Sequence, residues 1–340
     1  MDFKEQIAAY AAQIGIDKIG FAQATQTWQK DKYEEYLRLG YSCGFENQDI
    51  VKRYALSTDD FTAATIIAVA IAFPPYQAPV NEYEARFCAA SVGIDYHAVM
   101  NEKLNDLGEF LLKLVPGSQY KIAADTGNWS DREIAVLCGL GWIGKNSNLV
   151  TKDYGSFVYL GEIIWDVSLE APLKLVEDHC LNCDLCVRAC PMLAIDDKRR
   201  MVDTRRCLAY KTLDKNYPTE ETIAKIAANG YIYGCDVCQL ACPYNQWLDN
   251  DKHIFWQENR DLAACDVWEL LKMSNKEFKQ KYGSISGSWR GKNVLIRNGI
   301  WILGARRLPE LRELWQEIAA GDNENLRLAA KWALAQYDEE

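Results

Sequence analysis

The segment CLNCDLCVRACP, residues 180–191, contains four cysteines at the spacing C-x-x-C-x-x-C-x-x-x-C-P. A second set consists of Cys207 and the three cysteines of CDVCQLAC, residues 235–242, which Pro243 follows. Eight thiols at these spacings are what two [4Fe–4S] clusters require. Because such clusters carry single electrons, the sequence predicts a ferredoxin-like module within a redox enzyme.

The two sets also predict which cysteines share a cluster. In two-cluster ferredoxins the fourth cysteine of each run ligates the other cluster. This rule assigns one cluster to Cys180, Cys183, Cys186 and Cys242, and the other to Cys190, Cys235 and Cys238, with Cys207 as its fourth ligand. The alternative is a pair of structural zinc sites, which also use four thiolates each. Three cysteines at successive x-x spacing before C-P fit clusters better than zinc.

The other four cysteines have no partner at ligand spacing, and most of them are expected to be buried thiols: Cys43, Cys88, Cys138 and Cys265. The chain of 340 residues suits one large domain or two to three smaller ones. Its N-terminal segment lacks a basic region, a long apolar region and a twin-arginine pair, so export is not expected. Twelve cysteines without such a signal predict metal ligation in a reducing cytoplasm. The apolar stretch 63–73 is too short to span a bilayer, so no membrane association is expected.

Hydrophobic periodicity predicts an N-terminal domain of alternating strands and helices. Helices are predicted at residues 3–14, 33–39 and 97–115, and strands at 18–22, 66–73, 121–124 and 157–165. The residues Ser130, Asp131, Arg132 and Glu133 match a capping box, which predicts a helix from there to about Cys138, ended by Gly139.

The complete pattern predicts an α+β fold in three domains. Residues 1–170 form an α/β-type domain, and residues 171–250 form the ferredoxin-like two-cluster module, with one helix near 220–228. Residues 251–340 form an all-α region, in which the segments 311–320 and 324–337 are an antiparallel helix pair of HEAT type.

Asp125 is the candidate acid of the N-terminal domain. It follows a short apolar strand, at the end of a strand where α/β proteins often place their chemistry. A carboxylic acid there could protonate an oxygen leaving group. The alternative is that Asp125 only turns the chain. The same alternative is stronger for Asp131, because the first turn of a helix favours a carboxylate.

The segment GLGWIGKN, residues 139–146, contains G-x-G-x-x-G but follows a helix, so it is not a dinucleotide fingerprint. Its glycines either let the backbone approach something flat and bulky, with Lys145 and Asn146 as polar contacts, or form a tight connecting turn. The chain has three histidines, His97, His179 and His253, and they form no cluster in the sequence. A histidine-ligated metal is therefore not predicted.

Residues 275–307 form a basic segment in an acidic chain. Their local charge is +7, whereas the whole chain has −10. Within them, Trp289 stands among glycines, serines and cations, a composition suited to RNA phosphates and a stacked base. The alternative is a solvated helical face. The cations of the segment are Lys276, Lys279, Lys281, Arg290, Lys292, Arg297, Arg306 and Arg307, against the one acid Glu277.

The chain resembles the epoxyqueuosine reductase family, cobalamin-dependent iron–sulfur enzymes of the last step of tRNA queuosine synthesis. The resemblance covers nearly the whole chain. Apart from the first cysteine run, it rests on FCAAS (87–91), DYH (95–97), ADTG (124–127), CGLGWIGKN (138–146), YGSFVYLGE (154–162), RRCLAY (205–210), IYGCDVCQLACPYN (232–245) and SGSWRGKN (286–293). The chain departs from the family where Cys138 replaces an alanine, and where Gly127-Asn128 replaces Ala-Pro beside Asp125.

The resemblance implies a cobalamin between the N-terminal domain and the cluster module, and Asp125 as the proton donor. It places Arg53, Cys88, Asp125, Lys145 and Asp236 at the cofactor, and it places Lys279, Lys281, Trp289, Arg290 and Lys292 at the tRNA anticodon stem-loop.

The implied reaction removes an epoxide oxygen with two electrons, which a flavodoxin- or ferredoxin-like donor supplies through the clusters. The implied protein is a cytoplasmic monomer. The alternatives are a reductive dehalogenase-like enzyme acting on a small molecule, and a non-catalytic electron-transfer or RNA-binding adaptor.

Overall fold

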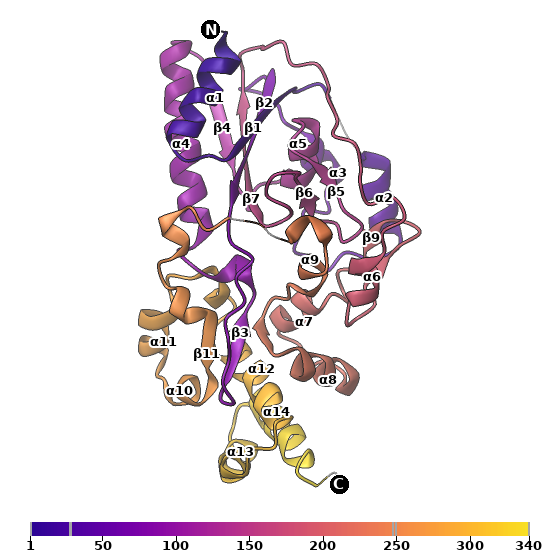
Figure 1. The fold of residues 1–340 in the computed structure, drawn as a ribbon, viewed down its shortest axis with the longest axis vertical. Helices are drawn as coiled ribbons and strands as arrows, with labels where there is room; N and C mark the ends of the chain where they lie inside the picture. The colour runs from indigo at the N-terminus through magenta and orange to yellow at the C-terminus, as the bar shows by residue number, and fades with distance from the viewer. Residues whose placement is uncertain (1, 27–28, 247, 249, 339–340) are drawn as a thin grey trace.

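The computed structural model is an elongated molecule whose N-terminal and C-terminal parts lie at opposite ends of its longest axis (Figure 1). It describes residues 2–26, 29–246, 248 and 250–338. The ends of the predicted outer domains, residues 1 and 339–340, therefore lie outside the described residues. Within the described ranges, no helix is both long and apolar enough to cross a membrane.

The N-terminal part is built on a four-stranded sheet in the order β1-β2-β7-β4. Its strands are β1 (Lys18–Gln23), β2 (Thr65–Ala72), β7 (Val158–Trp165) and β4 (Tyr120–Ala123). Every neighbouring pair is antiparallel. The prediction of an α/β-type domain is therefore wrong in detail, because this sheet has none of the parallel pairs that βαβ crossovers produce. The broader α+β prediction stands.

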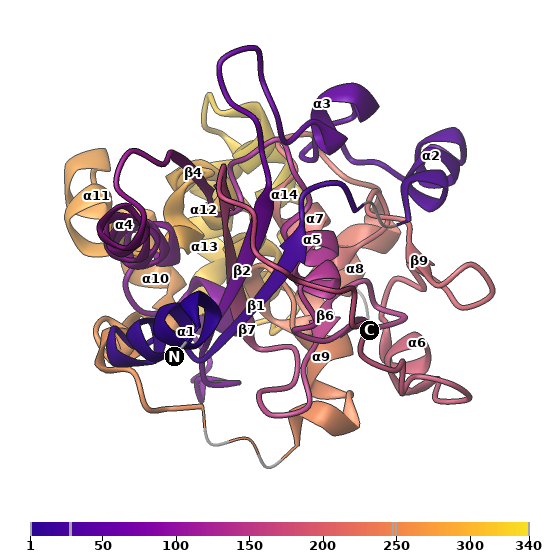
Figure 2. The ribbon, with the colours of Figure 1, turned by 90° about the horizontal axis from the view of Figure 1, so that it is seen from above.

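Helices cover both faces of this sheet, which explains why β2 is buried at every residue. Helices α1 (Phe3–Gln13) and α4 (Tyr96–Leu114) lie on one face and α5 (Asp131–Leu137) on the other (Figure 2). Successive strand residues point to opposite faces. Accordingly, Ile67, Val69 and Ile71 join the core beneath α1 and α4, whereas Ile66, Ala68 and Ala70 join the core beneath α5.

A second sheet joins segments that are far apart in the sequence. Its order is β10 (Tyr231–Tyr233), β3 (Glu84–Phe87) and β11 (Ala264–Asp266), with β3 parallel to β10 and antiparallel to β11. One strand comes from each of the three predicted domains. The C-terminal region is thus not purely helical, because β11 completes this sheet. The domain boundaries themselves stay a prediction.

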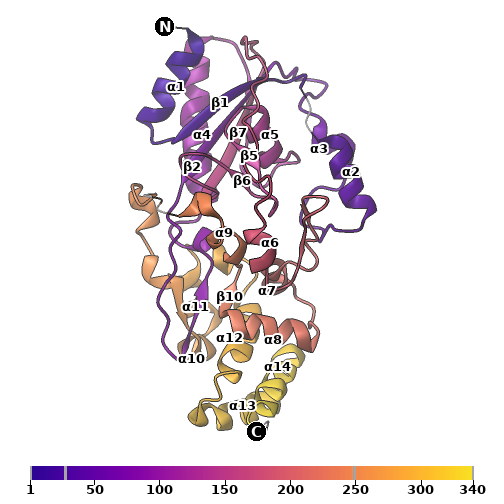
Figure 3. The same ribbon diagram turned by 45° about the vertical axis from the view of Figure 1, so that its right-hand side comes forward.

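The C-terminal part packs around α12 (Lys292–Gly304), which is buried from Val294 to its end. It packs against α8 (Glu220–Asn229), α10 (Val267–Lys272) and α14 (Glu324–Ala335), and α11 (Asn275–Tyr282) and α13 (Arg312–Ala319) belong to the same part of the chain. Helices α12, α13 and α14 lie together at the C-terminal end of the molecule (Figure 3). The predicted terminal helix pair is therefore present, while its HEAT character stays a prediction.

The cysteine-rich part lies between these two bodies and consists of short pieces. Helix α6 (Leu185–Ala189) packs on α9 (Val237–Leu240), and α7 (Leu208–Leu213) packs on α8. In the part of the chain that the structure describes, two further helices are α2 (Lys30–Arg38) and α3 (Ile50–Tyr54), and two hairpins pair β5 (Trp142–Ile143) with β6 (Leu149–Val150) and β8 (Ile195–Asp196) with β9 (Met201–Val202). The 3-10 turns described there are η1 (Ala89–Ser91), η2 (Pro243–Asn245), η3 (Ile254–Trp256), η4 (Arg260–Ala263), η5 (Ser286–Ser288) and η6 (Pro309–Leu311).

The predicted capping box at α5 is wrong. Ser130 is the N-cap residue, but its side chain makes no capping hydrogen bond. Glu133 turns away from the helix start because it accepts a hydrogen bond from Tyr54 at 2.8 Å and lies 3.6 Å from the Arg53 guanidinium. Gly139 does end the helix, with a φ of +76° that glycine adopts without strain.

Candidate active site and cysteine clusters

The four cysteines predicted for the first cluster surround one hollow of about 310 Å³. Three come from the loop before α6 and from α6 itself, and the fourth follows α9, which packs on α6. The hollow is lined by Cys180, Cys183, Cys186 and Cys242 together with Gly144, Lys145, Asn146, Val150, Leu185 and Pro243. The fold therefore brings together thiols that the sequence separates by more than fifty residues.

The cysteines of the second set interact electrostatically with one another. Burial, followed by the charges of Cys207 and Cys190, raises the pKa of Cys238 to about 12. Burial also raises the pKa of Cys235, and the charges of Cys238 and Cys207 add to this effect. Cys186 of the first set acts on Cys238 as well, so the two sets are neighbours. Within the described residues, no three His, Cys, Asp or Glu side chains are close enough together to hold a single metal ion.

The segment GLGWIGKN lines the first cysteine set through the β5–β6 hairpin. The Trp142 indole N–H lies 3.5 Å from the Cys180 sulfur, and the Lys145 ammonium pairs with Asp197 at 2.7 Å. A Cβ on Gly141 would lie 2.1 Å from the Val150 carbonyl oxygen. Glycine is required here because the hairpin backbones pack closely, which favours the interpretation as a tight turn.

Asp125 lies on the loop after β4 with a φ of +60°, a conformation that few residues other than glycine adopt. Its carboxylate is exposed and faces the His97 ring, with Oδ2 at 3.3 Å from Nε2. The other ring nitrogen lies 2.7 Å from Oδ1 of Asp95. The backbone N–H of Asp125 donates to Oδ2 of Asp131 at 2.8 Å.

These contacts set the protonation of the site. Hydrogen bonds to Asp125 and Asp95 raise the pKa of His97 to about 9. The bond to His97 in turn lowers the pKa of Asp125. At neutral pH the pair is an imidazolium beside a carboxylate. In the sequence, His97 was assessed only as a candidate metal ligand. Its membership of the DYH segment, residues 95–97, was the signal for a role in the active site.

The predicted cofactor contacts form separate groups. Cys88 and Asp236 are both buried and are neighbours, since the Asp236 charge acts on the Cys88 thiol. The Asp236 carboxylate accepts hydrogen bonds from the Ala89 backbone and the Gln77 side chain. Lys145 lies at the first cysteine set. Arg53 is also buried, but it lies at a different place, 3.6 Å from the Glu133 carboxylate and over the Tyr33 ring.

Phe45 and Trp289 form an exposed aromatic platform, of which only Trp289 was predicted from the sequence. Phe45 and Trp289 are 51% and 57% exposed, with ring centroids 5.8 Å apart. The Arg290 guanidinium lies 5.3 Å from the Phe45 ring and 4.6 Å from the Trp289 ring. Tyr210 packs its ring edge-on against Phe45 at 5.4 Å. Phe45 was missed, and its only signal was an aromatic residue four positions after Tyr41 in a mostly polar segment.

One tyrosine links the platform to the candidate acid. The Trp289 indole N–H donates to the Tyr233 hydroxyl at 2.6 Å. Burial raises the pKa of Tyr233, as do the charges of Cys88, Asp125 and Asp95. Tyr233 therefore lies near both the Asp125 loop and the platform.

The basic segment presents fewer free cations than predicted. Arg297 is 1% exposed because α12 carries it into the core, where it donates to the Asn216 carbonyl and lies over Trp301. Its place in a surface patch is therefore wrong. Arg306 donates to the backbone carbonyls of three residues, Asn81, Glu82 and Glu84.

The predicted RNA contacts differ in exposure. Lys279 is exposed, whereas the other three cations are half-buried. Lys281 pairs with Glu269 at 2.5 Å. Lys292 donates to the Met273 carbonyl, and Arg290 donates to the Leu213 carbonyl at 2.8 Å.

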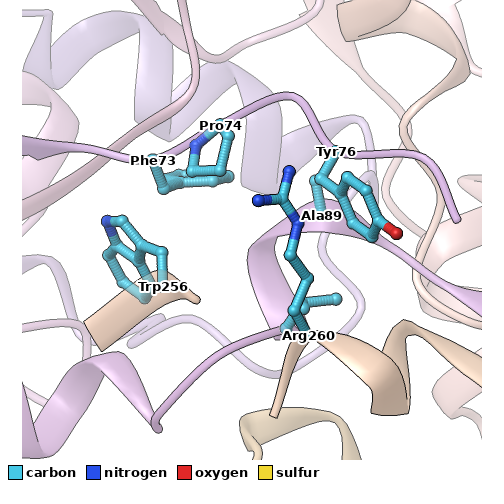
Figure 4. A pocket seen from close by; sticks show the side chains of 7 residues that line it. Phe73, Pro74, Tyr76, Ala89, Trp256 and Arg260 are labelled. Carbon is cyan, nitrogen blue, oxygen red and sulfur yellow. The ribbon is translucent and has the colours of Figure 1, made fainter. Parts of the chain in front are cut away.

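A small pocket of about 220 Å³ opens near the second sheet and contains none of the predicted site residues (Figure 4). Its Arg260 lies 4.1 Å over the Tyr76 ring and pairs with Asp251 at 2.7 Å. The pocket is lined by Phe73, Pro74, Tyr76, Ala89, Val92, Trp256 and Arg260.

The mixed fold and the paired cysteine sets define an iron–sulfur oxidoreductase. Residues 179–245 match the family model of the 4Fe-4S double cluster binding domain, and residues 61–126 match that of Epoxyqueuosine reductase QueG, DUF1730. The epoxyqueuosine reductase of Bacillus cereus is 39% identical over 98% of this chain and 90% of the relative. The chain belongs to the epoxyqueuosine reductase family, as the resemblance predicted.

Two solved structures extend the comparison. An epoxyqueuosine reductase with a tRNA-Tyr epoxyqueuosine-modified stem loop is 36% identical, with a TM-score of 0.91 over 99% of this chain and 90% of that chain. The enzyme from Bacillus subtilis, whose aspartate-bearing catalytic loop has swung out of its active site, is 36% identical, with a TM-score of 0.88 over 98% of this chain and 90% of that chain.

Proposed function

We propose that this chain reduces epoxyqueuosine to queuosine in the anticodon loop of tRNA, the last step of queuosine biosynthesis. The observation that carries the proposal is Tyr233, which accepts a hydrogen bond from the exposed Trp289 and interacts electrostatically with Asp125, the partner of His97. A proton source next to a stacking platform suits a reaction on a base presented by RNA. The relatives named epoxyqueuosine reductase support the same substrate.

The two clusters relay the electrons to the reaction. One is held by Cys180, Cys183, Cys186 and Cys242, and the other by Cys190, Cys207, Cys235 and Cys238. The hollow that the first four thiols surround supports the first assignment. Removing the epoxide oxygen to leave an alkene consumes two electrons and two protons and releases water. A flavodoxin- or ferredoxin-like donor outside the chain supplies the electrons one at a time. The protein itself acts as a cytoplasmic monomer.

Cobalamin is the second cofactor, and Arg53, Cys88, Lys145 and Asp236 would hold it with Asp125. The Nε of Arg53 supports the fit, since it is buried without a hydrogen-bond partner in the described residues. The amide oxygens of a corrinoid would satisfy this donor. When bound, the reduced cobalt supplies a strong nucleophile or reductant for the epoxide carbon.

The chain's own groups move the proton. His97 holds it at Nε2, which faces Oδ2 of Asp125. Asp125 is the proton donor to the opening epoxide oxygen, and the proton that it passes on comes from His97. In this arrangement the lowered pKa of Asp125 is compatible with a donor role, because His97 recharges it.

The tRNA is held by Trp289, Arg290, Lys279, Lys281 and Lys292, with Phe45 as a further stacking residue. The half-buried cations would exchange their internal carbonyl and carboxylate partners for phosphates. By analogy with the B. subtilis relative, the loop that bears Asp125 also moves. The residues Gly127-Asn128, unusual for the family, belong to this loop, and Asn128 accepts a hydrogen bond from Asn47 at 2.9 Å.

The test is turnover of epoxyqueuosine-containing tRNA by anaerobically reconstituted protein, with nucleosides measured by mass spectrometry. Wild-type protein is expected to form queuosine. Asp125→Asn is expected to lose at least about a hundredfold in kcat, since general acid catalysis contributes on this scale. The variant should retain the iron content and corrinoid spectrum of the wild type.

Two results would contradict the proposal. Normal turnover by Asp125→Asn removes this residue from the mechanism. Reduction of halogenated aromatics, with tRNA left unchanged, supports the dehalogenase-like alternative instead.

A further inference from the structure

Glu162 is a carboxyl group in the middle of the N-terminal sheet. It lies on β7 and is 0% exposed, and no amide, hydroxyl or cationic group among the described residues donates to its carboxyl oxygens; its hydrogen-bond partner is a second carboxyl group, that of Asp131. Its neighbours across the sheet are Ala68 on β2 and Ala123 on β4. These small side chains leave room for it, but they offer it no polar group. A buried carboxyl group without an amide, hydroxyl or cationic donor is costly, so its environment requires an explanation.

The explanation lies above the sheet, at the start of α5. Glu162 points to the same face as Ile164 two residues further on, and Ile164 belongs to the core beneath α5. The residue of α5 whose charge acts most on Glu162 is Asp131. Asp131 in turn accepts the backbone N–H of Asp125 at 2.8 Å. A line of contacts thus leads from the sheet interior to the loop that carries the candidate acid.

The loop needs such a support, because its conformation is strained. Asp125 has a φ of +60°, which costs free energy in a residue with a Cβ. The exposed carboxylate interacts with the side chains of His97 and Tyr96, whereas the amide bond to Asp131 fixes the backbone itself. Without the acceptor on Asp131, the loop would relax toward an ordinary conformation and take the carboxylate away from His97.

We propose that Glu162 and Asp131 form a carboxyl pair that latches the Asp125 loop over the active site, which makes Glu162 a positioning residue for the reaction. The inference rests on the role proposed above for Asp125. Glu162 touches neither substrate nor cofactor. It acts by holding the Asp131 carboxylate in the orientation that receives the Asp125 amide.

Burial of both carboxyl groups favours a proton held between them. Burial, and then the charge of Asp131, raises the pKa of Glu162 well above its ordinary value. Burial also raises the pKa of Asp131, while the amide of Asp125 opposes this effect. Two adjacent buried carboxyl groups cannot both ionise readily, and the proton is held more tightly by Glu162, whose pKa is raised further than that of Asp131. The other groups that share an electrostatic interaction with Glu162 are the Asp125 carboxylate and the Cys138 thiol.

Three substitutions test the latch. Glu162→Gln keeps a hydrogen-bond donor toward Asp131, whereas Glu162→Leu removes it at similar volume. Asp131→Ala removes the acceptor and lies at a half-buried helix start. The matched control is Ile164→Val, which alters the same strand and the same face without touching a carboxyl group.

The first measurement is hydrogen–deuterium exchange of a peptide covering residues 124–130, followed by mass spectrometry. It needs neither tRNA nor turnover. We expect Glu162→Leu and Asp131→Ala to exchange at least about tenfold faster than wild type at the Asp125 amide, because this amide loses its acceptor. Glu162→Gln and Ile164→Val should exchange as wild type does.

The second measurement is steady-state turnover of epoxyqueuosine tRNA. Glu162→Leu should lower kcat at least about tenfold with KM within about twofold, since the loop positions the acid without binding RNA. Glu162→Gln should recover most of the loss. Wild-type exchange and wild-type kcat in Glu162→Leu would overturn the latch. So would a Glu162→Gln variant that exchanges as fast as Glu162→Leu. Inactive wild-type protein with the expected exchange pattern would instead count against the proposed substrate alone.

Discussion

At the scale of single residues, the site depends on which group carries the proton. A free carboxylic acid would be nearly fully ionised at neutral pH. The structure places the imidazolium of His97 against Asp125, so the proton remains available while the carboxylate stays charged. Asp95 supports the same ring from its other nitrogen. In the proposed mechanism the acid is therefore a pair of side chains rather than Asp125 alone.

The pH dependence of turnover should report this pair. The pKa of His97 is raised to about 9, so the ring is protonated below that pH and neutral above it. We expect kcat to be level near neutrality and to fall as the pH rises through about 9. His97→Gln cannot hold the proton, so its kcat should be low and should lack this alkaline limb. The check is kcat against pH from 6 to 10 with saturating tRNA.

The control is Asp17→Asn, which removes a carboxylate partner of His253 at a different place. This variant should keep the alkaline limb of the wild type. An unchanged limb in His97→Gln would show that another group titrates there.

A second residue-scale prediction concerns Phe45. Stacking of a base on an aromatic ring contributes about 1–3 kcal/mol, so removing one ring should weaken RNA binding measurably. We expect Phe45→Ala and Trp289→Ala each to raise the Kd for the tRNA stem-loop by about tenfold. The check is fluorescence anisotropy with a labelled stem-loop at fixed salt.

Phe3→Ala is the matched control, because Phe3 is also a partly exposed phenylalanine, at 40%, on α1 in the N-terminal part of the molecule. It should bind as wild type does. Equal affinity of all three variants would remove stacking from the proposed mode of RNA binding.

At the scale of elements, the cysteine module is held in place by short helices. Its helices α6 and α9 have five and four residues, too short to be stable alone. They pack on each other, and the thiols at their ends converge. The metal centres would therefore stabilise this part, as is usual for small metal-binding modules.

The ligand assignment can be tested with cysteines that lie near one another. Cys43 lies close enough to Cys207 for its charge to act on that thiol, yet only Cys207 is a predicted ligand. Two clusters contain about eight iron atoms per chain. We expect Cys207→Ser to lower the iron content of anaerobically reconstituted protein to about four atoms. Cys43→Ser should retain the full content.

The measurement is iron and sulfide content together with the electron paramagnetic resonance spectrum of the reduced protein. Loss of iron in Cys43→Ser but not in Cys207→Ser would reverse the assignment. Zinc in place of iron would support the alternative of structural zinc sites.

Most elements could be predicted from the sequence because their signals are local. The strand at β2 and the helices at α1 and α4 follow from hydrophobic periodicity, which short segments contain in full. The failures have non-local causes. Glu133 does not cap α5, because its carboxylate contacts Arg53 and Tyr54 instead. Strand β11 forms because its backbone pairs with the distant strand β3. Arg297 entered the core because α12 is central to the C-terminal part.

At the scale of the whole molecule, the cysteine module lies between the antiparallel sheet and the helical C-terminal part (Figure 3). The three-stranded sheet β10-β3-β11 connects them through backbone hydrogen bonds. This arrangement places the Asp125 loop, Tyr233 and Trp289 around one region, although they come from three predicted domains. The active site is therefore expected to need the intact chain.

The location of the RNA surface predicts how binding responds to salt. Removing the cation that neutralises one phosphate lowers the slope of log Kd against log salt by about one. We expect Lys279→Glu, at an exposed position of α11, to weaken stem-loop binding and to reduce the slope by about one or more. The check is the Kd measured across a series of salt concentrations.

Lys4→Glu is the control, because Lys4 lies on α1, far along the molecule from α11 (Figure 1). Its slope should match the wild type. An equal change in both variants would show that binding responds to net charge rather than to a defined surface.

The sequence by itself predicted the two cysteine sets, the family and the main strands and helices of the N-terminal part. These depend on spacing and periodicity, which neighbouring residues carry. Only the tertiary structure decided that His97 faces Asp125, that Phe45 meets Trp289 and that Glu162 lies beneath Asp131. Such pairs arise from strand register and from the packing of distant segments. Since a shift of one residue in register turns a side chain to the opposite face of a sheet, contacts of this kind are fixed only when the whole chain folds.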